Sequence, residues 1–343
     1  MAVAWMYRAL FGLACSLPSL CLASWAMAPA ANAIVVSDPQ AAVTEFIFAA
    51  GRGDLKEMEA ILRVDPDVIN RARVDKDGRK HLTAIHQAAS QGRADSIRFL
   101  ASHAADLNAV DHGTGARPLH NAARTNHGKA IEALLDAGAD LNGLSVHPTD
   151  RSIGSVIKTW PDDTPLDVAA ACGAKDAVAI LLQRGAKLDG NPPECPQSAL
   201  HHAVSCTYGT ARKINQMAPG NRDVIDLLVK SGADFSTKNF MGQQPVHKAV
   251  EGLCPDTLEY ILDKYRDRID INAEGPSGYR PLAYAVVTAP VRQRKDDRVQ
   301  VVKLLKKHGA DISLACGPAT PPLRPLEYAI QHNREEDVLK LLR

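Results

Sequence analysis

Aromatic side chains are scarce in this sequence of 343 residues, where phenylalanine, tryptophan and tyrosine together make up 5%. An excess of one charge is also lacking, because 40 lysine and arginine residues are balanced by 39 aspartate and glutamate residues, for a formal net charge of +1. Without a basic run or stripe, the sequence gives no electrostatic case for a nucleic-acid partner. The rest, 45% hydrophobic and rich in alanine and leucine, is typical of a folded protein with small side chains between closely packed helices.

The motifs of common enzyme classes are missing as well. The sequence contains no Gly-x-Ser-x-Gly, no His-Glu-x-x-His and no phosphate-binding loop. Residues 75–78 (DKDG) begin like a calcium loop but lack the distant glutamate. Carboxylate pairs at residues 162–163 and 296–297 are expected at helix starts, where the helix dipole stabilises negative charge. We therefore predict a non-enzymatic protein with no catalytic residues, no cofactor and no metal site.

Residues 1–33 differ from the rest of the chain. They carry one charged residue, Arg8, and then a long apolar run that ends in Ala31-Asn32-Ala33, the small-x-small pattern read by signal peptidase. We predict that residues 1–33 are a secretory signal peptide, that the protein is periplasmic or secreted, and that it has no membrane contact beyond the signal. The absence of an Asn-x-Ser/Thr sequon favours a bacterial source. The alternative is an uncleaved anchor at residues 9–28, which would make the protein a membrane-tethered adaptor.

A short pattern recurs through the remaining sequence, and Arg117-Pro118-Leu119-His120 is a good example of it. A pair of small residues such as Ala122-Ala123 follows, then an amphipathic run, then a stop such as Gly138-Ala139-Asp140. The pattern starts near residues 83, 117, 164, 198, 244, 280 and 324. The shorter intervals are close to about 33 residues, and the longer ones fit the same unit with insertions.

These residues resemble the ankyrin repeat, whose signature is Thr-Pro-Leu-His-x-Ala. The resemblance covers about residues 41–343, with a degenerate N-terminal cap at residues 41–70 followed by about seven repeats. It implies one domain, residues 34–343, folded as an all-α repeat solenoid of paired antiparallel helices with β-hairpin fingers. A Thr or Ser cap, a Pro at the first helical position and a left-handed Gly at the helix end fit that design. Together with a signal peptide, the chain resembles exported bacterial ankyrin-repeat proteins.

The repeated histidines gain a role from this resemblance. His86, His120, His201 and His247 occupy one repeat position, which in ankyrin repeats is structural and hydrogen-bonds near the finger. A catalytic or metal site needs different residue types that converge on one point, whereas a repeat array spreads these side chains along a line. We therefore predict that the four histidines are structural.

The resemblance also implies protein binding through the finger tips and the exposed ends of the first helices. The helix-end positions are chemically mixed, which favours a protein partner over a polyanion. The predicted partner-binding residues are Arg124, Thr125, Cys172, Cys206 and Glu251 at helix ends, and His112, Phe240, Met241, Tyr279 and Trp160 in fingers. Phe240 and Met241 stand where a turn is normally polar, so they form a binding hot spot or fold back onto an insertion. Trp160 is either an anchor on a partner or a lid over its finger.

Five cysteines follow the signal segment: Cys172, Cys195, Cys206, Cys254 and Cys316. Their spacing resembles neither a disulfide framework nor a zinc site, and an odd count leaves at least one thiol unpaired. Cys172 and Cys206 share a position in adjacent repeats. Packed helices lie about 8–10 Å apart, whereas bridged Cα atoms lie below about 7 Å, so a direct bridge is strained and two unpaired residues are the default. Cys195 could reach either of them or neither.

Insertions distinguish this chain from a plain array. Residues 143–162 and 313–323 extend fingers, while residues 207–220 and 288–295 fall between the two helices of repeats four and six. The two inter-helix insertions lie two repeats apart on one edge and could form a single basic lip: Arg212, Lys213, Arg292, Arg294 and Lys295. A solvated loop is the simpler explanation of such a cluster.

The sequence therefore predicts a scaffold that holds or modulates one protein partner, in an immunity, inhibitor or enzyme-protecting role whose partner is unknown. The alternative from another class is an enzyme whose site lies in the insertions and uses His147, Asp150 or the cations of the lip. A concave pocket with converging polar groups would favour that alternative.

Overall fold

Each recurrence of the sequence pattern begins a short helix in the computed structural model, which describes residues 39–74, 81–146, 163–189, 198–205, 221–287, 295–332 and 334–343. The helices come in pairs. The first helices of the pairs are α1 (Pro39–Arg52), α3 (Ala84–Ser90), α5 (Pro118–Arg124), α7 (Pro165–Ala171), α9 (Ala199–Val204), α11 (Pro245–Glu251), α13 (Pro281–Val287) and α15 (Pro325–Gln331).

The second helix of each pair carries the amphipathic run. These helices are α2 (Leu55–Val64), α4 (Ala94–Ser102), α6 (Gly128–Asp136), α8 (Lys175–Gln183), α10 (Asn221–Lys230), α12 (Pro255–Lys264), α14 (Lys295–Lys307) and α16 (Glu336–Leu342). Three short 3₁₀ turns complete the described part: η1 (Pro66–Asn70), η2 (Arg266–Arg268) and η3 (Pro276–Gly278).

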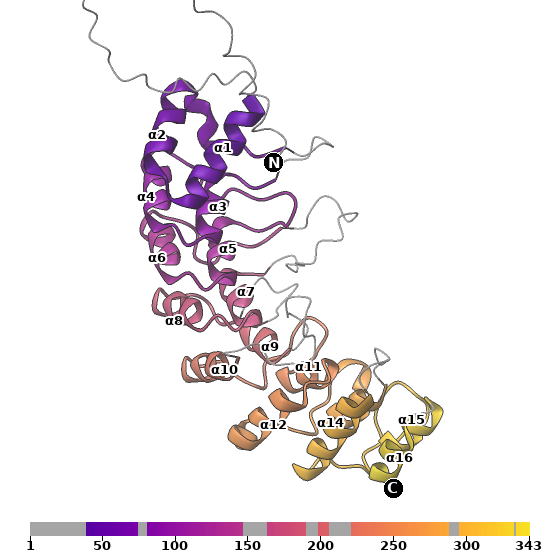
Figure 1. Ribbon diagram of the computed structural model, residues 1–343. Coiled ribbons are helices and arrows are strands. Elements are labelled where there is room, and N and C mark those ends of the chain that lie inside the picture. Colours follow the sequence, from indigo (N-terminus) through magenta and orange to yellow (C-terminus); the bar gives the residue numbers. More distant parts are fainter. Residues whose placement is uncertain are drawn as a thin grey trace, which may run out of the picture. The chain divides into compact units, whose positions relative to one another are not determined.

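The helices stack in chain order, so that each pair packs on the next (Figure 1). Every first helix contacts the following first helix, from α1 to α15, and the second helices pack along a neighbouring row, with α4 on α6 and α14 on α16. The result is an all-α repeat solenoid, as the sequence predicts. No helix in the described ranges is long and apolar enough to cross a membrane.

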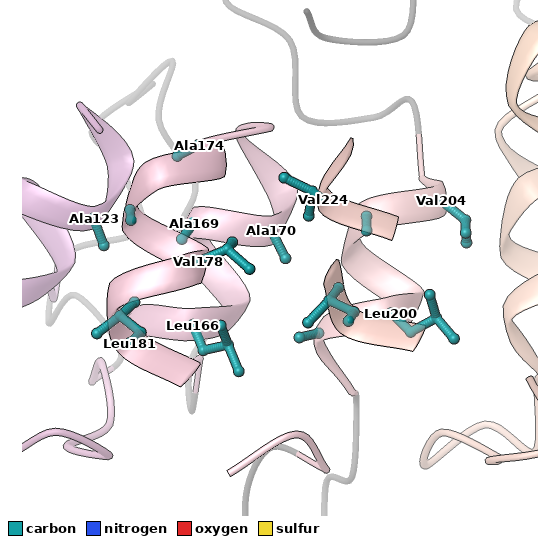
Figure 2. Close-up of a cluster of buried hydrophobic side chains, with 14 of the residues drawn as sticks. Ala123, Leu166, Ala169, Ala170, Ala174, Val178, Leu181, Leu200, Val204 and Val224 are labelled. Atoms are coloured by element: carbon teal, nitrogen blue, oxygen red, sulfur yellow. The ribbon is translucent and has the colours of Figure 1, made fainter. Parts of the chain in front are cut away.

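Small residues allow this close stacking. Ala169 and Ala170 of α7 are fully buried, and Leu166, Val178 and Leu200 pack around them between neighbouring pairs (Figure 2). Burying a leucine or valine side chain contributes about 1.5–3 kcal/mol. Because the same arrangement recurs at each junction, one continuous core runs from α1 to α16.

Caps and tight turns define the ends of each pair. Thr164 caps α7, where its hydroxyl accepts a hydrogen bond from the backbone N–H of Asp167 at 3.2 Å. After the second helices, Gly138 and Gly309 adopt φ of 99° and 92°, the left-handed conformation that ends a helix. The described fingers are hairpin-like turns held by a few backbone hydrogen bonds rather than strand ladders, and an isolated antiparallel bridge joins Cys316 to Leu323.

Candidate functional site

His120 shows how each repeat is tied to the next finger. Its Nδ1 accepts a hydrogen bond from the backbone N–H of Arg117 at 3.2 Å, so the ring proton lies on Nε2, which donates to the carbonyl of Asp163 at 2.9 Å. The Nε2 atoms of His86 and His201 lie 3.3 and 2.8 Å from carbonyl oxygens of the fingers that follow them. For these three histidines the predicted structural role is confirmed, whereas Nε2 of the fourth, His247, has no hydrogen-bond partner within the described residues.

Burial keeps the repeated histidines neutral. It lowers the pKa of His120, His201 and His247 to about 4, and it lowers the pKa of His86 as well. A neutral imidazole has one donor and one acceptor nitrogen, and His120 uses both at the finger junction. His86, His120 and His201 therefore tie their repeats to the fingers that follow.

The third repeat departs from this scheme. Asp163 is not the helix-start carboxylate that the sequence predicts, because α7 begins two residues later and Thr164 is its cap. The Oδ1 atom of Asp163 instead lies 3.3 Å from Nε2 of His202, a fully buried histidine on α9. Asp296 and Asp297 do lie in the first turn of α14, as expected.

The finger between the fourth and fifth repeats presents two apolar side chains. Phe240 is 52% exposed and Met241 is 47% exposed. Beneath them the Oδ1 atom of Asn239 accepts hydrogen bonds from the backbone N–H groups of Met241 and Gln243, at 3.0 and 2.9 Å. Asn239 and Gln243 are buried, so the turn is held rigidly from below. The neighbouring insertion, residues 207–220, lies outside the described residues, so the alternative in which Phe240 and Met241 fold back onto it stays a prediction.

Gln243 links this fingertip to the neighbouring helices. Its Nε2 donates to Oε2 of Glu251 at 3.1 Å and to the hydroxyl of Tyr284 at 2.8 Å. Lys248 pairs with the same Glu251 oxygen at 2.8 Å, on the same face of α11. Burial and the charge of Glu251 raise the pKa of Tyr284, which therefore stays protonated. The predicted binding residue Glu251 thus belongs to a polar network beside Phe240 and Met241.

Tyr279 extends the same surface to the next finger. Its ring lies 6.5 Å from the ring of Tyr284 and 5.3 Å from that of Tyr328, in edge-to-face arrangements. The Tyr328 hydroxyl donates to the carbonyl of Cys316 at 2.9 Å, which fixes the finger at residues 313–323. Sequence reasoning missed Tyr284 and Tyr328. Their common position, one residue after the repeated histidine site, was the signal that could have found them.

The other predicted residues lie one by one along the array. Arg124 and Thr125 end α5 and are partly exposed, and His112 is exposed at its fingertip. Cys172 is a partly buried free thiol, so the Cys172–Cys206 bridge does not form. Burial raises the pKa of Cys172 and keeps the thiol protonated.

One cysteine whose pairing the sequence left open forms a disulfide. Cys254, buried at the start of α12, is disulfide-bonded, and its partner lies outside the described residues. The spacing of the cysteines did not predict this bond, because pairing depends on which loops the fold brings together.

Several predicted residues lie outside the described part of the chain. Of the binding residues these are Cys206 and Trp160, and of the basic lip they are Arg212, Lys213, Arg292 and Arg294. Lys295, placed in an insertion by the sequence, is the first residue of α14. The catalytic alternatives His147 and Asp150 also lie outside it. Within the described ranges, no group of three or more histidine, cysteine or acidic residues could hold a metal ion.

A family model of ankyrin repeats, in three copies, matches residues 46–144 and 213–316, which together exceed half of the chain. The chain belongs to the ankyrin-repeat family. Its structure is similar to the ankyrin repeat domain of human ASB11, with a TM-score of 0.54 and 22% identity over 76% of this chain and 96% of that one. That likeness shows the fold.

Curated ankyrin-repeat relatives share only part of their length with this chain. A B-cell lymphoma 3 protein homolog from Mus musculus is 27% identical over 53% of this chain and 36% of its own length. An E3 ubiquitin-protein ligase KEG from Arabidopsis thaliana is 26% identical over 71% of this chain and 13% of its own. The match thus spans about a third or less of these relatives. Ankyrin repeats are in general non-enzymatic scaffolds for protein–protein interaction, and this array has the same architecture.

Proposed function

We propose that the protein is an exported, non-enzymatic ankyrin scaffold that holds one folded protein partner against its fingertips and first-helix ends. The observation that carries the proposal is the fingertip of Phe240 and Met241, two apolar side chains about half exposed on a turn fixed by buried Asn239 and Gln243. A preformed turn loses little entropy on binding, and an exposed aromatic residue is a typical hot spot. Glu251, Lys248 and Tyr279 supply a polar and aromatic rim around it.

Two features support export. The signal-like segment at residues 1–33 ends in a small-x-small site. Cys254 is disulfide-bonded, and disulfides persist in oxidising compartments and are rare in the cytosol. These two features support the proposal of a periplasmic or extracellular partner.

The experiment is affinity capture from periplasmic extract of the source cell with the mature chain as bait, followed by titration of the captured protein. We expect Phe240→Ala to weaken binding at least tenfold, a loss of about 1.4 kcal/mol or more. Arg124→Ala should have a smaller effect, because Arg124 lies three repeats from the fingertip. Val64→Ala on α2 is the control, because Val64 is an exposed apolar residue (61%) on the row of second helices.

Equal affinities for the Phe240 and Val64 variants would remove the fingertip from the binding surface. The activity or survival of the captured partner, measured with and without the scaffold, then separates an inhibitory role from a protective one.

A further inference from the structure

The junction between the third and fourth repeats contains a buried cluster of two carboxylates and a histidine, Asp163, Asp167 and His202. Asp167 stands at the repeat position that His86, His120 and His201 occupy elsewhere. The next repeat carries an additional histidine, His202, which is 0% exposed and faces back toward the third repeat. Two departures from the pattern therefore meet at one junction.

The geometry of the cluster ties the two repeats together. Nε2 of His202 lies 3.3 Å from Oδ1 of Asp163, whose side chain is 8% exposed. The Oδ2 atom of Asp167 accepts hydrogen bonds from the backbone N–H and the hydroxyl of Thr164, at 2.9 and 2.7 Å. Its other oxygen, Oδ1, is buried and receives no hydrogen bond within the described part of the chain. A buried carboxylate oxygen of this kind favours taking up a proton.

The helices packed around the cluster add further titratable, charged and polar groups. α11 contributes Lys248 and His247, α9 contributes His201, α7 contributes Cys172, and α5 contributes His120 and Arg124. α10 contributes the amide of Asn221, which donates to Ala203 O at 3.2 Å, while its Arg222 and Asp223 are exposed. Two carboxylates therefore share one buried imidazole, with Lys248 as the cation on the next repeat.

We propose that Asp163, Asp167 and His202 form a proton-stabilised joint, that is, a contact between two repeats that becomes more stable on mild acidification. The same acidification destabilises the histidine-tethered junctions on either side. The proposal goes beyond protein binding, because it gives one junction of the scaffold a response to pH opposite to that of its neighbours.

The direction follows from the protons that each state binds. Burial raises the pKa of Asp167 to about 6, although the charge of His202 opposes it. Burial alone would lower the pKa of His202, but the charges of Asp163 and Asp167 outweigh burial and raise it. Both groups thus hold protons more tightly in the folded protein than in the unfolded chain. Their stabilising contribution is present at low pH and is lost as pH rises through the folded pKa.

The neighbouring histidines respond in the opposite sense. The pKa values of His120 and His201 are lowered to about 4, so the unfolded chain binds more protons than the folded protein between pH 6.5 and 4. Acidification therefore destabilises the junctions on either side of the joint.

The first test is an NMR titration of the histidine side chains in the full chain, with His202 assigned by through-space contacts to its own backbone. We expect the His202 ring to be charged at pH 6.5, where the rings of His120 and His201 are neutral. A His202 ring that is neutral at pH 6.5 overturns the proposal, and this arm needs no variant to fold.

The second test is urea unfolding of Asp167→Asn, in which a neutral amide replaces the carboxylate. The ratio of folded to unfolded protein should exceed that of the unsubstituted chain by about tenfold or more at pH 7.5 and differ little at pH 4.5. Asp189→Asn, at an exposed position, is the matched control and should not change with pH. An advantage of Asp167→Asn that is the same at both pH values overturns the proposal.

Discussion

Only glycine fits at position 115, because the next finger packs too closely against it for a side chain. Its φ is +74°, and a Cβ atom built there would lie 1.8 Å from the carbonyl oxygen of Val146. Val146 in turn donates its backbone N–H to the carbonyl of Gly115 at 2.9 Å. Gly138 has a similar left-handed backbone, φ +99°, but its Cβ would meet nothing within 4 Å. The two glycines therefore separate backbone strain from steric exclusion.

We predict that Gly115→Ala lowers the free energy of unfolding by about 2 kcal/mol or more beyond the effect of Gly138→Ala. Both variants place alanine in the left-handed region, which costs about 1 kcal/mol, and only the first forces one finger away from the next. Urea denaturation of the two variants measures the difference. Equal losses would mean that the finger at residues 143–146 moves aside without cost.

The repeated histidines could be assigned from the sequence, whereas Asp163 could not. His120 recurs at a fixed position, so its role follows from periodicity. His202 and Asp163 are 39 positions apart in the chain and meet only because α9 stacks on α7. A pattern one repeat long carries no information about such a pair. The exposure of Phe240 was equally open, because it depends on the buried side chains of Asn239 and Gln243.

At the scale of helices, two arginine side chains cap the C-terminus of α13 by donating hydrogen bonds to its last carbonyl groups. Arg334, at the entrance to α16, donates from Nε to the carbonyl of Val286 at 2.5 Å and from Nη2 to that of Val287 at 2.9 Å. Arg298, a fully buried residue of α14, donates to the same Val286 carbonyl at 3.4 Å. Positive charge at a helix C-terminus satisfies orphan carbonyls and complements the helix dipole. Arg334 thereby fastens the last helix pair to the one before it.

We predict that Arg334→Ala destabilises the last helix pair by about 1.5–3 kcal/mol, the range for hydrogen bonds to a charged group. Amide hydrogen exchange should show faster exchange in α15 and α16, with α1–α8 unchanged. Arg343→Ala is the control, because Arg343 is 61% exposed and its contact with Glu336 at 3.6 Å is a surface ion pair of little value. Protection in α15 that is unaffected by Arg334→Ala would show that packing alone holds the pair.

Helix positions could largely be predicted from the sequence, because each start of the repeated pattern precedes a helix. For example, α5 begins at Pro118 and α7 at Pro165, one residue after the predicted starts. The boundaries of the insertions were less predictable. Lys295 belongs to α14, because an insertion has no period from which its end can be read. Arg298 was missed because its burial depends on how α14 packs against α13 and α16.

At the scale of the whole molecule, stability is approximately a sum over neighbouring repeats. The buried histidines lie in four different repeats, at the starts of α3, α5, α9 and α11. At each of these junctions the buried imidazole is stable only in its neutral form, so protonation of the histidine favours the unfolded chain. Asp167 and His202 act in the other direction at a single junction. Four junctions with a buried histidine of lowered pKa, against the single junction of Asp167 and His202, set the sign of the pH response for the described array.

We predict that the array loses stability as pH falls from 6.5 to 4. The pKa values of His120, His201 and His247 are lowered to about 4 in the folded protein. Between pH 6.5 and 4 the unfolded chain therefore binds more protons than the folded protein does. Each histidine contributes a slope of up to about 1.4 kcal/mol per pH unit. Urea midpoints at constant ionic strength measure it, and His247→Gln should reduce the slope by about one proton, whereas His112→Gln, at an exposed fingertip, should leave it unchanged. A midpoint that rises on acidification would mean that the Asp167 junction outweighs the histidine tethers.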